Sequence, residues 1–243
     1  MSQIQLEEFD DIVYKSGIPR SMGYGYYFRE HIFSKINLKK KKILDLGGGN
    51  GIAGVYAALS EESAAITIVD PLEDGSNSRM MEQYESLQEI SKVKNVTFFQ
   101  GFLEELAEEE KFDVILMHNS INHIAEDHVA SLHLSQNAKK VYLDKLGYIL
   151  SRLKSGGKFI IADCSNKNFW GFLHFPNPVA PSIEWHLHQP PEVWREIIEE
   201  LGLKHQSTAW TARRELGSIG KIILANRLTS YFLDSHFVSK YSK

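Results

Sequence analysis

The sequence predicts an α/β fold with a doubly wound, mostly parallel seven-stranded sheet that ends in an antiparallel hairpin. From Lys41 onward, short apolar runs alternate with helical stretches, as in right-handed βαβ units. The runs are apolar on successive residues, which is typical of parallel strands covered on both faces. We also expect N-terminal helices before the sheet and an insertion after its fifth strand.

The individual elements follow from local patterns. Apolar residues three or four apart predict a helix over 3–16, and the segment 23–33 is expected to be helical at its end. The helix before the fifth strand is expected to include Leu153 and to stop at the glycine signal Ser155-Gly156-Gly157. The five expected parallel strands contain the runs 43–44, 65–69, 96–99, 114–117 and 158–162.

The C-terminal part predicts one helix and two further strands. Proline suits a first helical turn, so a helix is expected from Pro190-Pro191-Glu192 to Leu201-Gly202. The runs 206–211 and 219–225 leave no room for a helix between them and are expected to form the hairpin. The resulting division is a helical lid or arm over 1–40, an α/β domain over 41–226 with a substrate-lid insertion at 164–190, and a weakly patterned tail over 227–243.

Composition and net charge limit the classes of function that this sequence can have. The 243 residues carry a net charge of −4, which disfavours a general nucleic-acid-binding surface. Cys164 is the only cysteine, so an intrachain disulfide is impossible and a reducing compartment is expected. The acidic N-terminus lacks the apolar region of a signal peptide, and no apolar run approaches the roughly 20 residues that span a bilayer. We expect a cytoplasmic protein without a membrane partner.

A glycine-rich loop follows the first expected strand. Gly49-Asn50-Gly51-Ile52-Ala53-Gly54 matches GxGxxG, and Asp70 ends the next strand 19 residues after Gly51. Glycines allow a ligand to approach the backbone closely, and the strand-end carboxylate can accept bonds from ribose hydroxyls. This pattern also fits an NAD-dependent oxidoreductase. Asp45 argues against it, because a carboxylate there would repel a pyrophosphate but would suit the ammonium of S-adenosylmethionine (SAM).

Several motifs together resemble class I SAM-dependent methyltransferases over roughly residues 40 to 226. The segment 43–51 is similar to their motif I, and 68–71 and 112–119 to their second and fourth strands. Leu153-Lys154-Ser155-Gly156-Gly157 is similar to their entry into strand 5, and the terminal hairpin completes their sheet. The resemblance implies SAM as methyl donor and S-adenosylhomocysteine (SAH) as product.

The resemblance also implies roles for residues. Asp45, Gly47 and Gly49 surround the methionine part of SAM, with Asn50 in the same loop. Asp70 binds the ribose, and Pro71 or Leu72 lies against the adenine. Where the family often has an acidic residue for the adenine amino group, this chain has Phe102 after Gly101, which suggests stacking or backbone contacts. His118 and Asn119 fall where the family approaches the sulfonium and the substrate.

Methyl transfer requires mainly alignment and exclusion of water, with a base where the nucleophile enters protonated. Histidine is the usual base near neutral pH, so His118 and His123 are the candidate catalytic residues, with structural packing as the alternative for each. The acceptor is expected to contact polar and aromatic side chains: Tyr24, Tyr27, Asn122, Trp170, His174, Trp185 and His186. Aromatic groups predict a small, partly apolar acceptor, methylated on O or N.

Three other possibilities follow from the same residues. The pair His186 and His188 lacks a carboxylate motif, so no metal site is expected. The segment Asn119-Ser120-Ile121-Asn122 stands where DNA amino-methyltransferases have Asn/Asp-Pro-Pro-Tyr/Phe, which argues against base methylation. A non-catalytic SAM-binding or partner-binding module is the third possibility, with Tyr231, Phe232 and Phe237 as its interface.

Overall fold

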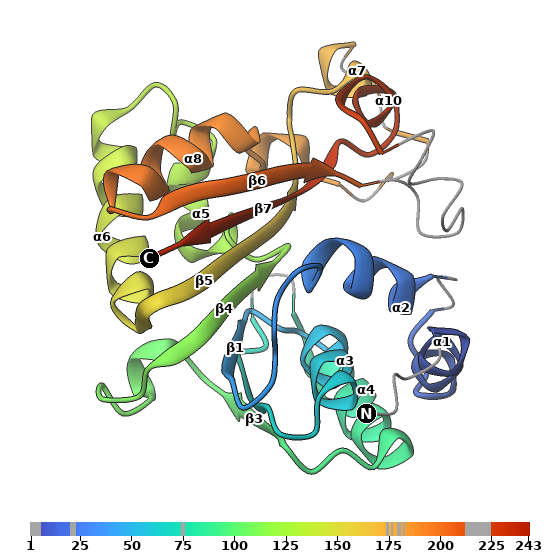
Figure 1. Ribbon diagram of the computed structural model, residues 1–243. Helices are drawn as coiled ribbons and strands as arrows, with labels where there is room; N and C mark the ends of the chain where they lie inside the picture. Colours follow the sequence, from blue (N-terminus) through green and yellow to red (C-terminus); the bar gives the residue numbers. More distant parts are fainter. Residues whose placement is uncertain are drawn as a thin grey trace. The chain divides into compact units, whose positions relative to one another are not determined.

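The computed structural model describes residues 6–19, 23–73, 76–173, 175, 177–178, 181, 183–211 and 225–243. The chain forms two compact units, Met1–His118 and Asn119–Lys243, which are described separately below (Figure 1). The boundary follows the fourth strand, inside the segment predicted as one α/β domain.

The first unit contains four parallel strands in the order β3-β2-β1-β4. The strands are β1 (Lys42–Leu46), β2 (Ala65–Asp70), β3 (Val96–Gln100) and β4 (Phe112–His118). The helices are α1 (Leu6–Lys15), α2 (Tyr24–Tyr27), the π-helical turn η1 (Phe28–Ile32), α3 (Ile52–Ser60), α4 (Ser78–Ser91) and the short η2 (Leu103–Glu105). The predicted N-terminal helices and four strands are therefore present.

Helix α3 packs tightly onto this sheet because its sequence is almost entirely apolar or small. Its residues from Ile52 to Ala58 are all buried. A Cβ atom at Gly54 would lie 2.9 Å from Cδ1 of Ile68 in β2, so only glycine allows this close approach. The helix thereby places its N-terminal turn beside the ends of β1 and β2.

The second unit is built around three strands. Strand β7 (His236–Ser242) lies between β5 (Leu153–Cys164) and β6 (Lys204–Trp210) and is antiparallel to both. Helices α6 and α8 pack beside these strands, and α7 packs against α10 (Figure 1). The helical segments are η3 (His123–Ala125), α5 (Glu126–Val129), α6 (Gln136–Ser151), α7 (Phe169–Phe172), η4 (Trp185–Leu187), α8 (Pro191–Glu200) and α10 (Arg227–Phe232).

The predicted boundary between the helix and the fifth strand is wrong. Helix α6 ends at Ser151, and β5 already begins at Leu153. The glycine pair is strand backbone because it pairs with the last residue: Gly156 N donates to Lys243 O at 3.1 Å, and Lys243 N donates to Gly157 O at 3.1 Å. A contact so distant in sequence leaves no local signal.

The strand that pairs with β6 in the described part of the chain was not predicted. Among the described residues β6 pairs with β7, which lies in the segment expected to be a weakly patterned tail. The run 219–225 lies outside the described residues except for Ala225. The signal in β7 is weak because Ser239 interrupts its apolar pattern. This serine is buried between two strands, where its hydroxyl lies 2.8 Å from Oγ1 of Thr208.

The predicted fold class is confirmed despite these local errors. The strand order is β3-β2-β1-β4-β5-β7-β6, a mostly parallel seven-stranded α/β sheet that ends in antiparallel strands. Within the described part of the chain, none of the helices has the length and apolar character needed to cross a membrane.

Candidate active site

The glycine loop lies between β1 and α3 in the first unit. Gly47, Gly49 and Gly51 all have positive φ angles, of 70°, 55° and 71°, a region that glycine enters without the steric cost of a Cβ atom. The amide of Gly47 donates to Val69 O at 2.8 Å, which ties the loop to the end of β2. The predicted cofactor residues of this loop are therefore held in one turn.

Asp45 is the most unusual group of this loop. It is 1% exposed, and its Oδ2 accepts a bond from Gly54 N at 3.1 Å. Its Oδ1 is buried and has no hydrogen-bond partner. The pKa of Asp45 is raised to about 7: burial raises it most, the bond from Gly54 lowers it, and the charge of Asp70 raises it. The Oδ1 atom lacks a donor among the described residues, which costs free energy in a buried site.

Asp70, at the end of β2, accepts hydrogen bonds from the glycine loop and from the residues that follow β2. Its Oδ2 accepts bonds from Gly49 N at 2.7 Å and Ser76 Oγ at 3.2 Å, and its Oδ1 accepts from Leu72 N at 2.8 Å. A carboxylate offers about four acceptor positions, so these three bonds leave one for a ligand hydroxyl. Asp70 therefore shapes the loop as well as offering an acceptor.

The other predicted cofactor residues of the first unit surround this loop or follow β3. Asn50 Nδ2 lies 3.3 Å from Gln83 Oε1, and Pro71 is partly exposed directly after β2. Gly101 N donates to Asp70 O at 3.1 Å. The ring of Phe102 is 52% exposed, and its amide donates to Glu105 Oε2 at 2.7 Å. The Phe102 ring is thus open to stacking.

The structure brings His118 and Tyr27 together. The Tyr27 hydroxyl lies 3.2 Å from Nε2 of His118, and the two ring centroids are 5.5 Å apart. The ring of Phe28 packs against His118 at 5.8 Å and against Tyr24 at 6.2 Å. The histidine at the end of β4 therefore contacts the aromatic N-terminal segment, with the Tyr27 hydroxyl beside its Nε2.

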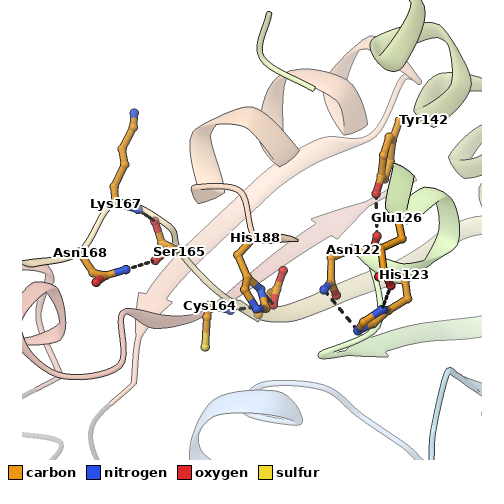
Figure 2. Close-up of polar contacts among 10 residues, drawn as sticks. Asn122, His123, Glu126, Tyr142, Cys164, Ser165, Lys167, Asn168 and His188 are labelled. Carbon is orange, nitrogen blue, oxygen red and sulfur yellow. Dashed lines mark hydrogen bonds and ion pairs between the residues drawn. The ribbon is translucent and has the colours of Figure 1, made fainter. Parts of the chain in front are cut away.

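A second cluster of polar side chains lies in the second unit, and Figure 2 shows its members. The Nδ1 atom of His123 lies 2.5 Å from Glu126 Oε2, and its Nε2 lies 3.3 Å from Asn122 Nδ2. Tyr142 donates from its hydroxyl to Asn122 O at 2.8 Å. The predicted residues Asn122 and His123 are therefore in contact, and a carboxylate orients the histidine.

His188 forms a similar pair with a more deeply buried carboxylate. Its Nδ1 lies 2.8 Å from Oδ1 of Asp163, which is 0% exposed, whereas the His188 side chain is 13% exposed. Burial, and after it the charges of Asp163 and Glu126, raise the pKa of Tyr142 above its usual value. Figure 2 shows His188 near Asn122 and His123, and we treat the two histidine–carboxylate pairs as one cluster.

This cluster contains several buried acceptors without donors. Oδ1 of Asn122 and Oδ2 of Asp163 have no hydrogen-bond partner, and neither does Oε1 of Gln189, the residue that follows His188; these side chains are 0–1% exposed. Buried oxygens of this kind are normally satisfied by protein, water or ligand donors. The cluster therefore suits a molecule that carries N–H or O–H groups.

The remaining predicted residues are scattered. Asn119 is exposed with φ of 54°, and its amide donates to Ala162 O at 2.7 Å. Trp170 donates from Nε1 to Phe232 O at 2.8 Å, and the ring of Trp185 lies 6.4 Å from that of His188. His186 is exposed on η4. His174 lies outside the described residues.

Sequence reasoning missed Asp163, His188 and Glu126 as a group. A carboxylate at the C-terminal end of the fifth strand, where ligands of α/β sheets bind, was a signal for Asp163. Glu126 stands three residues after His123, a spacing that allows contact on a helical turn. Nothing local pairs Asp163 with His188, because 24 residues separate them. No metal-ligating group of three side chains occurs in the described residues.

The fold and the acidic glycine loop define an α/β protein built to hold a nucleoside ligand at the ends of its parallel strands. A family described as a methyltransferase domain matches residues 37–207, more than half of the chain. The protein therefore belongs to the methyltransferase domain family, and this decides against the oxidoreductase interpretation of the loop. The cofactor of class I members is SAM.

Two curated relatives match shorter regions. The histidine protein methyltransferase 1 homolog of Dictyostelium discoideum is 28% identical over 128 residues, 51% of this chain and 40% of the relative. The ribosomal RNA small subunit methyltransferase G of Aliivibrio fischeri is 33% identical over 91 residues, 36% of this chain and 41% of the relative. The matched region thus spans about two fifths of each relative.

Solved structures agree on the fold over nearly the whole chain. A SAM-dependent methyltransferase from Aquifex aeolicus has a TM-score of 0.53 with 14% identity, covering 96% of this chain and 97% of its own. The plantazolicin methyltransferase BpumL, solved with SAH, has a TM-score of 0.54 with 15% identity, covering 97% and 82%.

The residues present fit this cofactor. The unpartnered Oδ1 of Asp45 is a buried acceptor that an ammonium would satisfy. Gly49 has a φ of 55°, where a side chain would be strained, so glycine suits this turn. Asp70 retains one acceptor position for a hydroxyl.

Proposed function

We propose that this methyltransferase transfers a methyl group from SAM to an O or N atom of a small, partly apolar acceptor. Its donor side rests on Asp45, whose buried Oδ1 has no partner. Bound SAM supplies an electrophilic methyl group. The loop would hold the methionine part of SAM through Asp45, Gly47, Gly49 and Asn50. The nucleoside part and the sulfonium would be held by the other predicted residues: Asp70, Pro71, Gly101, Phe102, His118 and Asn119.

The acceptor side rests on the histidine–carboxylate cluster of the second unit. In each pair, Nδ1 faces a carboxylate, which fixes the tautomer that leaves Nε2 as the basic nitrogen. Nε2 of His188 has no partner among the described residues, whereas Nε2 of His123 already contacts Asn122. We therefore place His188 first as the proton acceptor, with His123 second and His118 in a packing role against Tyr27.

The unpartnered oxygens of Asn122, Asp163 and Gln189 support an acceptor that enters with its proton. They would orient an O–H or N–H group before the histidine removes the proton, which is the alignment that methyl transfer needs. Aromatic side chains of the segment 164–190, which lies in the same unit as the cluster, would exclude water from the acceptor.

The test is to incubate the protein with SAM labelled in its methyl group and a mixed extract, and to separate products by size and chemistry. We expect label in the low-mass fraction. Label in polypeptide or RNA would contradict the small-molecule assignment and favour acceptors of the kinds named for the two curated relatives. Saturable SAM binding without transfer to any fraction would favour the non-catalytic module.

Variants test the histidine assignment. His188→Gln removes the proposed base and is expected to lower kcat by about a hundredfold or more, with SAM affinity unchanged. His133→Gln is the matched control, because His133 is exposed in the same unit. A smaller loss in His188→Gln than in His123→Gln would reverse the order of the two histidines.

A further inference from the structure

A separate cavity lies in the second unit, between the end of β5 and helix α10. Its volume is about 450 Å³, within the range of small-molecule sites. The lining includes Lys167, Phe172, Glu192, Trp210, Arg227 and Tyr231. None of these residues belongs to the polar cluster described above. Lys167 and Phe172 lie in the segment predicted as a substrate lid, and Tyr231 was predicted only as part of a partner interface.

The loop after β5, which forms one wall of the cavity, is held by local hydrogen bonds. Asn168 Nδ2 donates to Ser165 O at 3.1 Å, Asn168 Oδ1 accepts from Gly171 N at 2.7 Å, and Lys167 N donates to Ser165 Oγ at 3.1 Å. Figure 2 shows these side chains, with the Lys167 side chain extending away from the other two. Ser165 and Asn168 are 0–1% exposed. This wall therefore presents the lysine on a preorganised support.

The charges of the cavity are unbalanced. Arg227 pairs with Glu192 at 3.2 Å from Nη2 to Oε1, whereas the ammonium of Lys167 has no partner among the described residues. Oε2 of Glu192 is buried without a donor, although the side chain as a whole is 42% exposed. The cavity thus offers one uncompensated cation and one unused acceptor.

Aromatic rings supply the rest of the lining. Trp210 ends β6, where its ring packs edge-on against Phe237 at 5.9 Å, so its position is fixed. Tyr231 and Phe172 come from the two short helices α10 and α7, which pack together. Aromatic walls favour planar ligands through offset stacking or edge contacts.

We propose that this cavity binds a planar aromatic small molecule that carries an anionic group and a hydroxyl. Lys167 recognises the anion, Trp210 and Tyr231 contact the ring, and Glu192 accepts from the hydroxyl. This proposal does not depend on the proposed methyl transfer, because its test needs no SAM.

The test uses 4-hydroxybenzoate as the probe and the full chain labelled with 5-fluorotryptophan. All four tryptophans lie in the second unit, and a Trp210→Phe variant assigns the Trp210 fluorine signal. We expect 4-hydroxybenzoate to shift that signal saturably and to leave the signal of Trp194, which is 0% exposed, unchanged. Absence of a saturable shift at Trp210 would overturn the proposal.

Charge recognition is tested by paired variants. Lys167→Gln should weaken 4-hydroxybenzoate binding by about threefold to tenfold. Lys204→Gln, at the opposite end of β6 and exposed, should leave it unchanged. The neutral 4-hydroxybenzamide should bind the wild type more weakly than the benzoate does, and should not distinguish Lys167→Gln from wild type. Equal losses in both lysine variants would overturn the assignment of the anion to Lys167.

Discussion

At the scale of single residues, Asp45 is the group that we propose binds the ammonium of SAM. Its position two residues before Gly47 already indicated a carboxylate directed at a cation rather than at a pyrophosphate. The structure adds that this carboxyl is 1% exposed, with Oδ1 unpartnered. A pKa raised to about 7 by burial then links the protonation of Asp45 to ligand binding.

This linkage predicts pH-dependent affinity for SAM. The ammonium of SAM favours the ionised carboxyl, and the fraction ionised rises as pH passes through about 7. SAM should therefore bind about tenfold more weakly at pH 6 than at pH 8, as measured by calorimetry. Asp45→Asn should bind weakly at both pH values without this slope. The control is Asp144→Asn, which removes an exposed carboxylate in α6 and should keep the wild-type dependence of SAM affinity on pH. If wild-type protein bound SAM equally at both pH values, the role of Asp45 would be contradicted.

Residue roles were predictable only where the backbone brings neighbours in sequence together. The glycine loop and its two carboxylates follow from a strand, a turn and a helix that are consecutive in the chain. The pair His188–Asp163 depends instead on where the segment before α8 packs, and no local pattern encodes that. His123 was predicted, whereas its partner Glu126 was not, although the two are three residues apart.

At the scale of elements, two glycines inside helices should respond oppositely to alanine. Alanine in a helix interior is usually more stable than glycine by about 1 kcal/mol. In α6, a Cβ atom at Gly147 would meet only Leu201 Cδ2 at 3.5 Å, so Gly147→Ala should stabilise by about 0.5–1 kcal/mol. In α3, a Cβ atom at Gly54 would lie 2.9 Å from two atoms of Ile68, so Gly54→Ala should destabilise by about 1–3 kcal/mol.

Denaturant unfolding of both variants beside the wild type measures this difference. Gly54→Ala should also lower SAM affinity, because Gly54 N is the donor to Asp45 Oδ2. If Gly54→Ala raised the free energy of unfolding as much as Gly147→Ala, that result would contradict the close packing of α3 on β2.

Element boundaries were predictable where helix signals are local, as at the Pro191 start of α8 and at Gly202, whose positive φ follows the end of α8 at Glu200. They failed at β5, whose first residues pair with Lys243, and at β7, whose buried Ser239 hides the strand pattern. Both errors have one cause, because each strand is defined by a partner from the other end of the unit.

At the scale of the whole molecule, strand β7 links the last part of the chain to two other strands. It pairs with β5 and with β6, and Phe237, Val238 and Tyr241 on it are 0–1% exposed. Lys243 adds bonds from Nζ to Leu150 O at 2.7 Å and to Leu153 O at 2.8 Å. The fold class was predictable because it depends on the alternation of strands and helices, whereas the identity of this central strand was not.

Deleting residues 236–243 should therefore unfold the second unit. Each of the three buried side chains contributes about 1.5–3 kcal/mol, and the deletion also exposes the edges of β5 and β6. Together these losses reach the 5–15 kcal/mol that typically stabilises a folded domain. All four tryptophans lie in the second unit, so the emission maximum of tryptophan fluorescence reports on this unit alone and should shift to that of exposed indole.

Removing Lys243 alone costs its hydrogen bonds, about 1–3 kcal/mol, and should leave the emission maximum unchanged. Native-like emission after the longer deletion would show that β5 and β6 hold their packing without β7, and that the strand pairing is not what stabilises this unit.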